Sequence, residues 1–363
     1  MAYTFNTDLL LNERDREEAR QEYPHIFFAL DNPLLREAFS PYDERANVSK
    51  TRSRRWGVFA VFLATGALLL AGGEMLFQGL PKAQLRLVAG IGGVAGIVSV
   101  AIGMFGVMFR ARKMRWLSDR LATERLRQFH FQQYVDAADE ILKGAGAEED
   151  ADAYKTARIK NFERIQSDLL DRIEEELTHL VHSEDPGEGM LFDQRDHQID
   201  PAAPHLQEYF DAYERLRFKR QIDYCDLVLR EKKGFWKHAP VRQAQILGAL
   251  ALGCVLAILG LHAMVLFGAL ANIYWMKGPL VHVLAIWAAI IALTARTFEE
   301  GFQPEREIER MRHYRLSLKR LYERFKETDD PAEKITIMRE LEKVTYQEMV
   351  LFLKGNYEAQ FVM

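Results

Sequence analysis

The chain has 363 residues, a formal net charge of −4 and 48% hydrophobic residues. This nearly balanced charge excludes a basic nucleic-acid coat protein and a disordered acidic tail. Its two cysteines, Cys225 and Cys254, have no metal-ligand spacing and cannot form a disulfide framework. Residues 1–50 are charged and show no apolar core followed by a cleavage site. We therefore expect a cytoplasmic helical segment there and no signal peptide.

Four apolar runs dominate the rest of the chain. They cover about 56–78, 87–109, 244–271 and 280–295. A helix needs roughly 20 apolar residues to cross the hydrocarbon layer of a bilayer. The first three runs reach that length, whereas the fourth is short and has His282 near its beginning. Soluble core helices rarely extend so far without a charge, so we predict four transmembrane helices.

Short connectors pair these spans into hairpins. Gly79–Lys82 is a tight turn between the first and second spans. Residues 272–279 join the third and fourth spans, with Tyr274 and Trp275 placed as interfacial anchors. Neither connector has room for a domain. The sequence therefore predicts two transmembrane hairpins, over residues 51–110 and 237–296.

Most basic residues that flank the spans lie on one side. The hairpin tips carry only Lys82, Arg86 and Lys277. Cytoplasmic flanks of bacterial membrane proteins are enriched in Lys and Arg. We therefore expect a multi-pass protein of the bacterial inner membrane, with both termini and the middle segment in the cytoplasm. The flanking cations are Lys50, Arg52, Arg54, Arg55, Arg110, Arg112, Lys113, Arg115, Lys232, Lys233, Lys237, Arg242 and Arg296.

The segments outside the membrane have helical patterns. Apolar residues from Phe162 to Leu180 recur at three- and four-residue steps, as in an amphipathic helix. A loop rich in Asp, Gly and Pro near 183–205 divides the cytoplasmic domain 111–236, and 144–153 forms a smaller acidic break. Residues 297–363 form a C-terminal helical segment. The predicted fold class is an all-α membrane protein, with four transmembrane helices in two hairpins and long cytoplasmic helical extensions.

A short motif occurs twice. Thr123–Phe131 and Ile308–Leu316 both read Glu-Arg-apolar-Arg-polar-aromatic from their second residue. Each copy follows a membrane exit, at Arg110 or Arg296, by nearly the same number of residues. Because both the motif and its offset are repeated, we interpret the two halves as a duplication.

These residues resemble the SLATT family of two-transmembrane bacterial effectors. The resemblance rests on Arg112-Lys-Met-Arg-Trp116 and Glu124-Arg-Leu-Arg127, with Glu309-Arg-Met-Arg312 as a second copy. It covers 50–131 well and 237–320 more loosely, and this chain differs by having two hairpins and a helical insert. The resemblance implies an anti-phage effector that forms a membrane pore. It also implies gating by a nucleotide or oligonucleotide from a partner nucleotidyltransferase.

Small residues form a stripe on the second span. Steps of three and four residues place them on one helical face, where a neighbouring backbone can approach closely. Similar stripes occur on the first and third spans. They indicate either a homo-oligomer, with a tetramer as the working assumption, or packing within one chain. The second-span stripe consists of Gly92, Gly96, Ser99, Gly103 and Gly106.

Glu74 is the only carboxylate within the predicted spans apart from their ends. Ionisable groups at depth are costly and usually face water or a partner. One hypothesis places Glu74, one per subunit, in a cation-selective ring at the outer pore mouth. The alternative places it in the headgroup region beside the turn.

Arginines among aromatic residues are the candidate ligand-binding groups. Arginine next to aromatic rings suits phosphates and stacked bases. Anionic lipid and ordinary helical ion pairs are the alternatives. The candidates are Arg125, Arg127, Arg217 and Arg220.

Enzyme motifs are absent from the sequence. Gly90–Gly96 superficially resembles a dinucleotide fingerprint, but no strand precedes it and it lies inside a span. The acidic loop residues Asp193, Asp196, His197 and Asp200 fit a solvated linker better than a metal site. We expect no enzyme, cofactor or metal. An oligomeric pore is the favoured function, a non-conducting scaffold that recruits a soluble partner is the alternative, and a transporter ranks below both.

Overall fold

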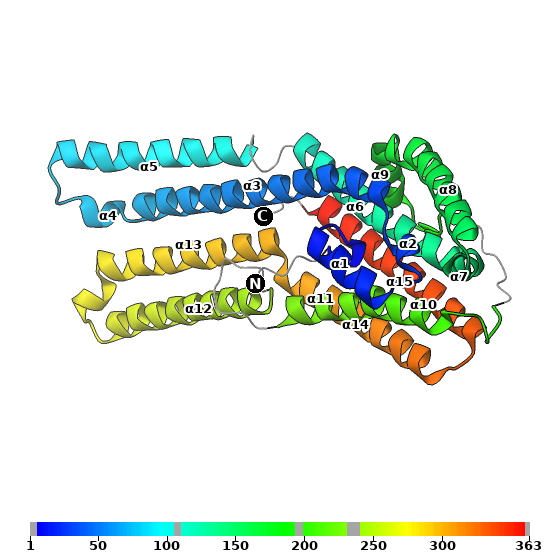
Figure 1. Cartoon of the computed structure of the whole chain (residues 1–363). Coiled ribbons are helices and arrows are strands. Elements are labelled where there is room, and N and C mark those ends of the chain that lie inside the picture. Colours follow the sequence, from blue (N-terminus) through cyan, green and yellow to red (C-terminus); the bar gives the residue numbers. More distant parts are fainter. Residues whose placement is uncertain (1–5, 105–109, 193–198, 231–239, 360–363) are drawn as a thin grey trace. The chain divides into compact units, whose positions relative to one another are not determined.

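The computed structural model describes residues 6–104, 110–192, 199–230 and 240–359. These residues form helices and connecting loops without any strand, so the all-α prediction is confirmed (Figure 1). The α-helices are α1 (Glu13–Glu22), α2 (Phe27–Leu30), α3 (Pro33–Gly72), α4 (Glu74–Phe77), α5 (Lys82–Ile102), α6 (Arg110–Asp136), α7 (Ala138–Gly146), α8 (Glu148–Ile165), α9 (Ile173–His182), α10 (Leu206–Tyr213), α11 (Arg220–Leu229), α12 (Pro240–Leu270), α13 (Pro279–Phe302), α14 (Pro304–Glu327) and α15 (Pro331–Glu358).

Shorter helical turns complete the chain. Two are 3₁₀ turns, η1 (Thr7–Leu9) and η5 (Tyr274–Lys277). Two are π-helical turns, η3 (Gln166–Leu170) and η4 (Glu214–Lys219). The residues group into two compact units. Unit 1 contains 1–48, 114–229 and 309–358, and unit 2 contains 49–113, 230–308 and 359–363.

Unit 2 holds the four apolar helices. Parts of α3, α5, α12 and α13 are long and apolar enough to span a membrane. Many of their apolar side chains are exposed, as in Ile97 at 73% and Leu270 at 80%. Such a surface is expected of helices that face lipid rather than water. The chain is therefore an all-α membrane protein with four membrane-spanning helices.

The first hairpin differs from the prediction at its tip. The first apolar helix ends at Gly72 rather than near residue 78, and α4 begins after a turn at Gly73. A Cβ on Gly72 would lie 2.8 Å from the Ile286 side chain of α13. Glycine at this position therefore permits the close approach of α13 to the end of α3.

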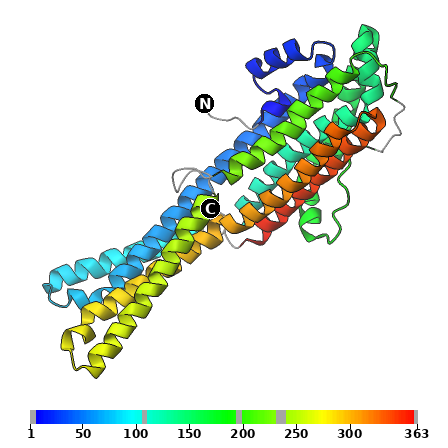
Figure 2. The ribbon, with the colours of Figure 1, turned by 90° about the horizontal axis from the view of Figure 1, so that it is seen from below.

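Helices α12 and α13 form the second hairpin (Figure 2). The helix of the fourth span extends beyond its predicted end. The apolar run ends near residue 295, but α13 has 24 residues and continues to Phe302. At 1.5 Å per residue it is about 36 Å long, enough to cross a bilayer. The fourth apolar run is therefore short, as expected, but it belongs to a helix that continues beyond it and is long enough to span the membrane.

Polar contacts join the two hairpins within unit 2. The indole of Trp287 on α13 donates to the carbonyl of Leu69 on α3 at 2.9 Å. The hydroxyls of Thr65 and Thr294 lie 2.8 Å apart. Lipid offers no competing hydrogen-bond partner, so these bonds help to hold α3 against α13.

Unit 1 has a large apolar core with a tyrosine pair inside it. The rings of Tyr134 on α6 and Tyr209 on α10 stack with centroids 4.5 Å apart. Each hydroxyl donates to the backbone carbonyl of the other tyrosine, at 2.8 and 3.0 Å. The reciprocal bonds satisfy both buried hydroxyls and fix α6 against α10.

The predicted loop near 183–205 contains no helix in its described part, as expected. It packs on α15, because Tyr346 donates to the Pro186 carbonyl at 2.8 Å and Lys354 to the Ser183 carbonyl at 2.6 Å. The expected acidic break at 144–153 is narrower than predicted: only Ala147, whose backbone is extended, separates α7 from α8. Three of its four acidic residues, Glu148, Glu149 and Asp150, belong to the first turn of α8, where the helix dipole favours them.

Candidate functional site

Glu74 lies outside the spanning helices. It is the first residue of the short helix α4, beyond the end of α3, and is exposed. The interpretation of Glu74 as a carboxylate within a span was wrong, because the helix breaks at Gly72–Gly73. This position matches the alternative, in which the carboxylate lies beside the hairpin turn.

Part of the small-residue stripe on α5 packs against α3 of the same chain. Gly92 and Gly96 would place a Cβ 3.6 and 3.7 Å from the Cβ atoms of Leu70 and Ala67. Ser99 is buried and donates to the Ala60 carbonyl at 2.8 Å. This part of the stripe is therefore occupied within the hairpin.

No such contact is described for the remaining residues of the α5 stripe, Gly103 and Gly106. A Cβ on Gly103 would meet nothing within 4 Å, and Gly106 lies outside the described residues. On α12, by contrast, the third-span stripe is exposed along its length. Its members are Ala249, Gly253, Ala257 and Gly260.

Arg217 is buried in the core of unit 1. Its guanidinium forms a two-point contact with the Glu342 carboxylate, at 2.8 and 2.7 Å, and lies 4.4 Å from the ring centroid of Phe131. Burial disfavours the charge on Arg217, but the partner carboxylate outweighs this and raises its pKa. The π-helical turn η4 buries Leu216, Arg217 and Phe218 in succession.

Arg127 is also buried. It pairs with Asp8 of η1 at 3.0 Å and with Glu124 at 2.9 Å. Burial raises the pKa of Asp8 despite the neighbouring Arg127 charge. Burial also opposes ionisation of Glu124, but the charges of Arg120 and Arg127 prevail and lower its pKa to about 2. Arg127 therefore joins the N-terminal turn to α6.

Arg125 contacts the loop and α15. It donates to the Gly189 carbonyl at 3.0 Å and lies over the ring of Tyr346. Its counterpart in the second motif, Arg310, pairs with Glu348 and lies over Phe352, also on α15. The repeated arginine thus has the same role in both motifs, which is to pack on α15.

The four candidate arginines do not form one ligand-binding surface. Arg125, Arg127 and Arg217 are at most 7% exposed and have partners within the chain. Only Arg220 is partly exposed. The interpretation of the first three as surface ligand groups was wrong, because their partners lie on elements distant in sequence.

A polar cavity of about 470 Å³ lies in unit 1, between α6, α7 and α8. An amide pair, Asn161 to Gln133 at 2.7 Å, forms part of its lining. Two aromatic residues, Tyr154 and Phe192, also line it. The charged lining residues are Asp136, Glu140, Asp150, Lys143 and Arg164, so acidic groups are in the majority.

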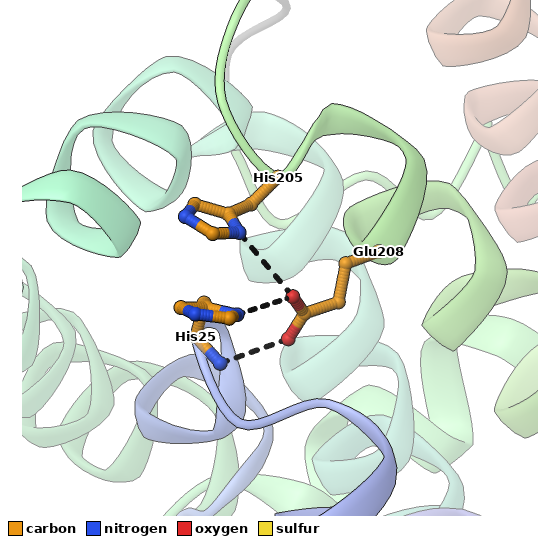
Figure 3. Close-up of side chains that lie close together, drawn as sticks. All are labelled: His25, His205 and Glu208. Carbon is orange, nitrogen blue, oxygen red and sulfur yellow. Dashed lines mark hydrogen bonds and ion pairs between the residues drawn. The ribbon is translucent and has the colours of Figure 1, made fainter.

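The sequence did not point to a cluster formed by His25, His205 and Glu208 (Figure 3). His25 lies between α1 and α2, and His205 is the residue before α10, which contains Glu208. The two imidazole rings stack, with centroids 3.7 Å apart. The only sequence signal was the spacing of His205 and Glu208, since His25 lies 183 residues before Glu208.

Most of the acidic loop cluster lies outside the residues that the structure describes. Asp193, Asp196 and His197 lie outside the described residues. The Asp200 carboxylate accepts the backbone N–H of Ala202 at 2.9 Å and so stabilises a turn.

No family model matches the chain, and no similar curated protein or solved structure was found. The resemblance to the SLATT family therefore stays a prediction.

Proposed function

We propose that the chain is an integral protein of a bacterial inner membrane, with its termini and middle segment in the cytoplasm. The exposed apolar surface of the four spans is the observation that carries membrane insertion. Exposed arginines at the flanks, including Arg52, Arg55 and Arg296, support the orientation. Such cations bind anionic lipid headgroups of the cytoplasmic leaflet.

Within this membrane the protein acts as an oligomeric, ion-conducting effector of an anti-phage defence system. The resemblance of its motifs to two-transmembrane effectors supports this function. Polar side chains inside the bundle donate hydrogen bonds to backbone carbonyls of the same chain. They are Ser99, Thr65 and Trp287. Because these polar groups are satisfied within one chain, we expect the conducting path to lie between copies.

The contact between copies is expected on α12 rather than on α5. Gly253 and Gly260 on α12 are exposed, and a Cβ on either would meet nothing within 4 Å. Small residues allow helices in lipid to approach closely and gain van der Waals contact. Gly92 and Gly96 on α5 already face α3.

A ligand that controls the effector has a suitable site in the polar cavity of unit 1. Cavities of this size hold small organic molecules. Its acidic majority favours a cationic or zwitterionic ligand over a polyphosphate. A nucleotide or oligonucleotide from a partner nucleotidyltransferase would need cations elsewhere, since three of the predicted arginines are occupied.

A non-conducting scaffold is the second candidate. The satisfied polar groups of the spans favour it, because a membrane anchor needs no polar path. In that role the helices of unit 1 would recruit a soluble partner.

Ion flux through reconstituted liposomes distinguishes the two functions. We expect the full-length protein to conduct, and Gly253→Leu to lose both the oligomer and the flux. Gly93→Leu is the matched control, since Gly93 is exposed on α5 with nothing near its Cβ position. Folded wild-type protein that never conducts, with or without added nucleotides, would support the scaffold instead.

A further inference from the structure

We propose that His25, His205 and Glu208 bind a divalent transition-metal ion, with Zn²⁺ as the best match. Two imidazoles and one carboxylate are a ligand set that Zn²⁺ accepts, with remaining positions taken by water. The three ligand atoms lie within 4.8 Å of one another. The inference is independent of ion conduction, because all three residues belong to unit 1.

The two carboxylate oxygens of Glu208 have different partners. Oε1 accepts the backbone N–H groups of His25 and Ile26, at 2.9 and 3.3 Å. Oε2 faces the imidazoles and lies 2.8 Å from Nδ1 of His25 and 3.5 Å from Nδ1 of His205 (Figure 3). Backbone donors therefore orient the carboxylate and leave one oxygen for a ligand. Such supporting bonds are typical of metal-binding side chains.

The two separations between the Glu208 oxygen and the imidazole nitrogens are close to those around a tetrahedral ion. With zinc–ligand bonds of about 2.0–2.1 Å, tetrahedral ligand atoms lie about 3.3 Å apart. The two oxygen–nitrogen distances fall on either side of this value. The imidazole planes meet at 21°, and both Nδ1 atoms face the Glu208 oxygen, so the two nitrogens point in similar directions (Figure 3). Binding therefore requires one ring to turn about its Cβ–Cγ bond, so that both lone pairs meet the ion.

The site is accessible to a solvated ion. The side chains of His25 and His205 are 49% and 28% exposed, whereas Glu208 is 16% exposed. In the metal-free state both Nδ1 atoms can carry a proton and share the Glu208 oxygen. Zn²⁺ would bind the Nδ1 lone pairs, so each neutral imidazole would carry its proton on Nε2 in the metal-bound state.

His205 has an unusual backbone conformation. Its φ is +62°, in the left-handed region that non-glycine residues adopt uncommonly, with Asn, Asp and His the most frequent among them. This conformation immediately precedes α10 and brings the imidazole beside His25. Residues in such conformations often have a functional reason to be there.

A bound ion would connect distant parts of unit 1. His25 follows α1, whereas Glu208 is on α10, so the ion would attach the N-terminal segment to the start of α10. Because the ion binds only the folded cluster, it would also stabilise the fold.

Zinc titration of the full-length protein tests this inference. The protein is purified in detergent without a histidine tag, stripped with a chelator and titrated with ZnCl₂ by calorimetry. We expect one ion per chain and a higher thermal midpoint with zinc. His25→Gln and His205→Asn should each weaken binding at least tenfold. Asn at position 205 retains the left-handed backbone, which separates ligand loss from misfolding.

His179→Gln is the matched control, because His179 is exposed on α9 away from the cluster. It should bind zinc as the wild type does. Circular dichroism of each variant verifies the fold. Failure of the wild type to bind zinc, or unchanged affinity in both cluster variants, would overturn the proposal.

Discussion

Arg217 lies between the Glu342 carboxylate, the Thr345 hydroxyl and the ring of Phe131. Both charged side chains are almost completely buried, at 2% and 0% exposed. Charges removed from water are tolerated only when a partner and hydrogen bonds compensate for the lost hydration. This pair therefore makes the docking of α15 on η4 specific.

Glu342→Gln should destabilise unit 1 strongly, because it leaves the Arg217 charge buried without a counterion. We expect a loss of about 3–5 kcal/mol in the free energy of unfolding. Denaturant unfolding in detergent, followed by circular dichroism, measures it. Glu340→Gln is the control, since Glu340 forms a half-exposed pair with Arg324 and should cost less than about 1 kcal/mol. Equal losses in the two variants would contradict the argument.

His130 on α6 should make stability depend on pH. Burial, together with the charges of Arg158, Arg217 and Arg36, lowers the pKa of its imidazole to about 3. In the unfolded chain the pKa is about 6.5, so unfolding takes up a proton between these values. The fold should therefore lose stability as the pH falls from about 6.5 towards 3, by up to about 1.4 kcal/mol per pH unit.

His130→Gln removes this titrating group. Between pH 4.5 and 6, the slope of the unfolding free energy against pH should be smaller in this variant by about 1.4 kcal/mol per pH unit. The control is His313→Gln on α14, where the imidazole is exposed in the folded protein. An unchanged slope in His130→Gln would show that the buried imidazole does not control the pH dependence.

At the scale of helices, the contact of α5 with α3 depends on small residues. Gly92, Gly96 and Ser99 face Ala60, Ala67 and Leu70, and the Ser99 hydroxyl satisfies a carbonyl of α3. Lipid tails are as apolar as the side chains, so close packing and hydrogen bonds stabilise the pair more than burial does.

Gly96→Leu should loosen the first hairpin, because its side chain would meet Ala67. We expect a loss of about 1–3 kcal/mol, typical of an overpacked interface. Thermal stability in detergent measures it. Gly93→Leu, on the exposed face of α5, should leave the stability unchanged. If Gly93→Leu lost more thermal stability than Gly96→Leu, the critical contact of α5 would lie on the face opposite to α3.

At the scale of the whole molecule, the distribution of charge predicts the orientation across the membrane. Exposed basic residues cluster at the flanks of the hairpins, whereas the tips carry few. Moving these cations across the bilayer is unfavourable, so we expect the tips to face outwards.

Cysteine labelling of intact cells tests this orientation. An impermeant maleimide should modify Gln78→Cys at the first hairpin tip, where the residue is exposed. It should not modify Asp15→Cys or Glu340→Cys until the cells are opened. Cys225 and Cys254 are both buried, and their replacement by alanine removes background labelling. Labelling of Asp15→Cys or Glu340→Cys in intact cells would contradict the predicted orientation.

The sequence alone determined the four spans, their pairing into hairpins and the absence of strands in the described chain. These features depend on local hydropathy and periodicity, because a bilayer requires long apolar helices whatever their neighbours. The steps of Gly92, Gly96 and Ser99 also predicted a packing face. They could not show whether that face meets the same chain or another copy.

Tertiary structure decided the roles of the charged residues. Arg217 and Glu342 are 125 residues apart, so no local pattern could show that the arginine is buried and paired. The π-helical turn η4 also changes which side chains face the core. His25 and Glu208 likewise meet only because folding places the segment after α1 beside α10. Burial and pairing depend on which elements come together, and this information is absent from any single segment of the chain.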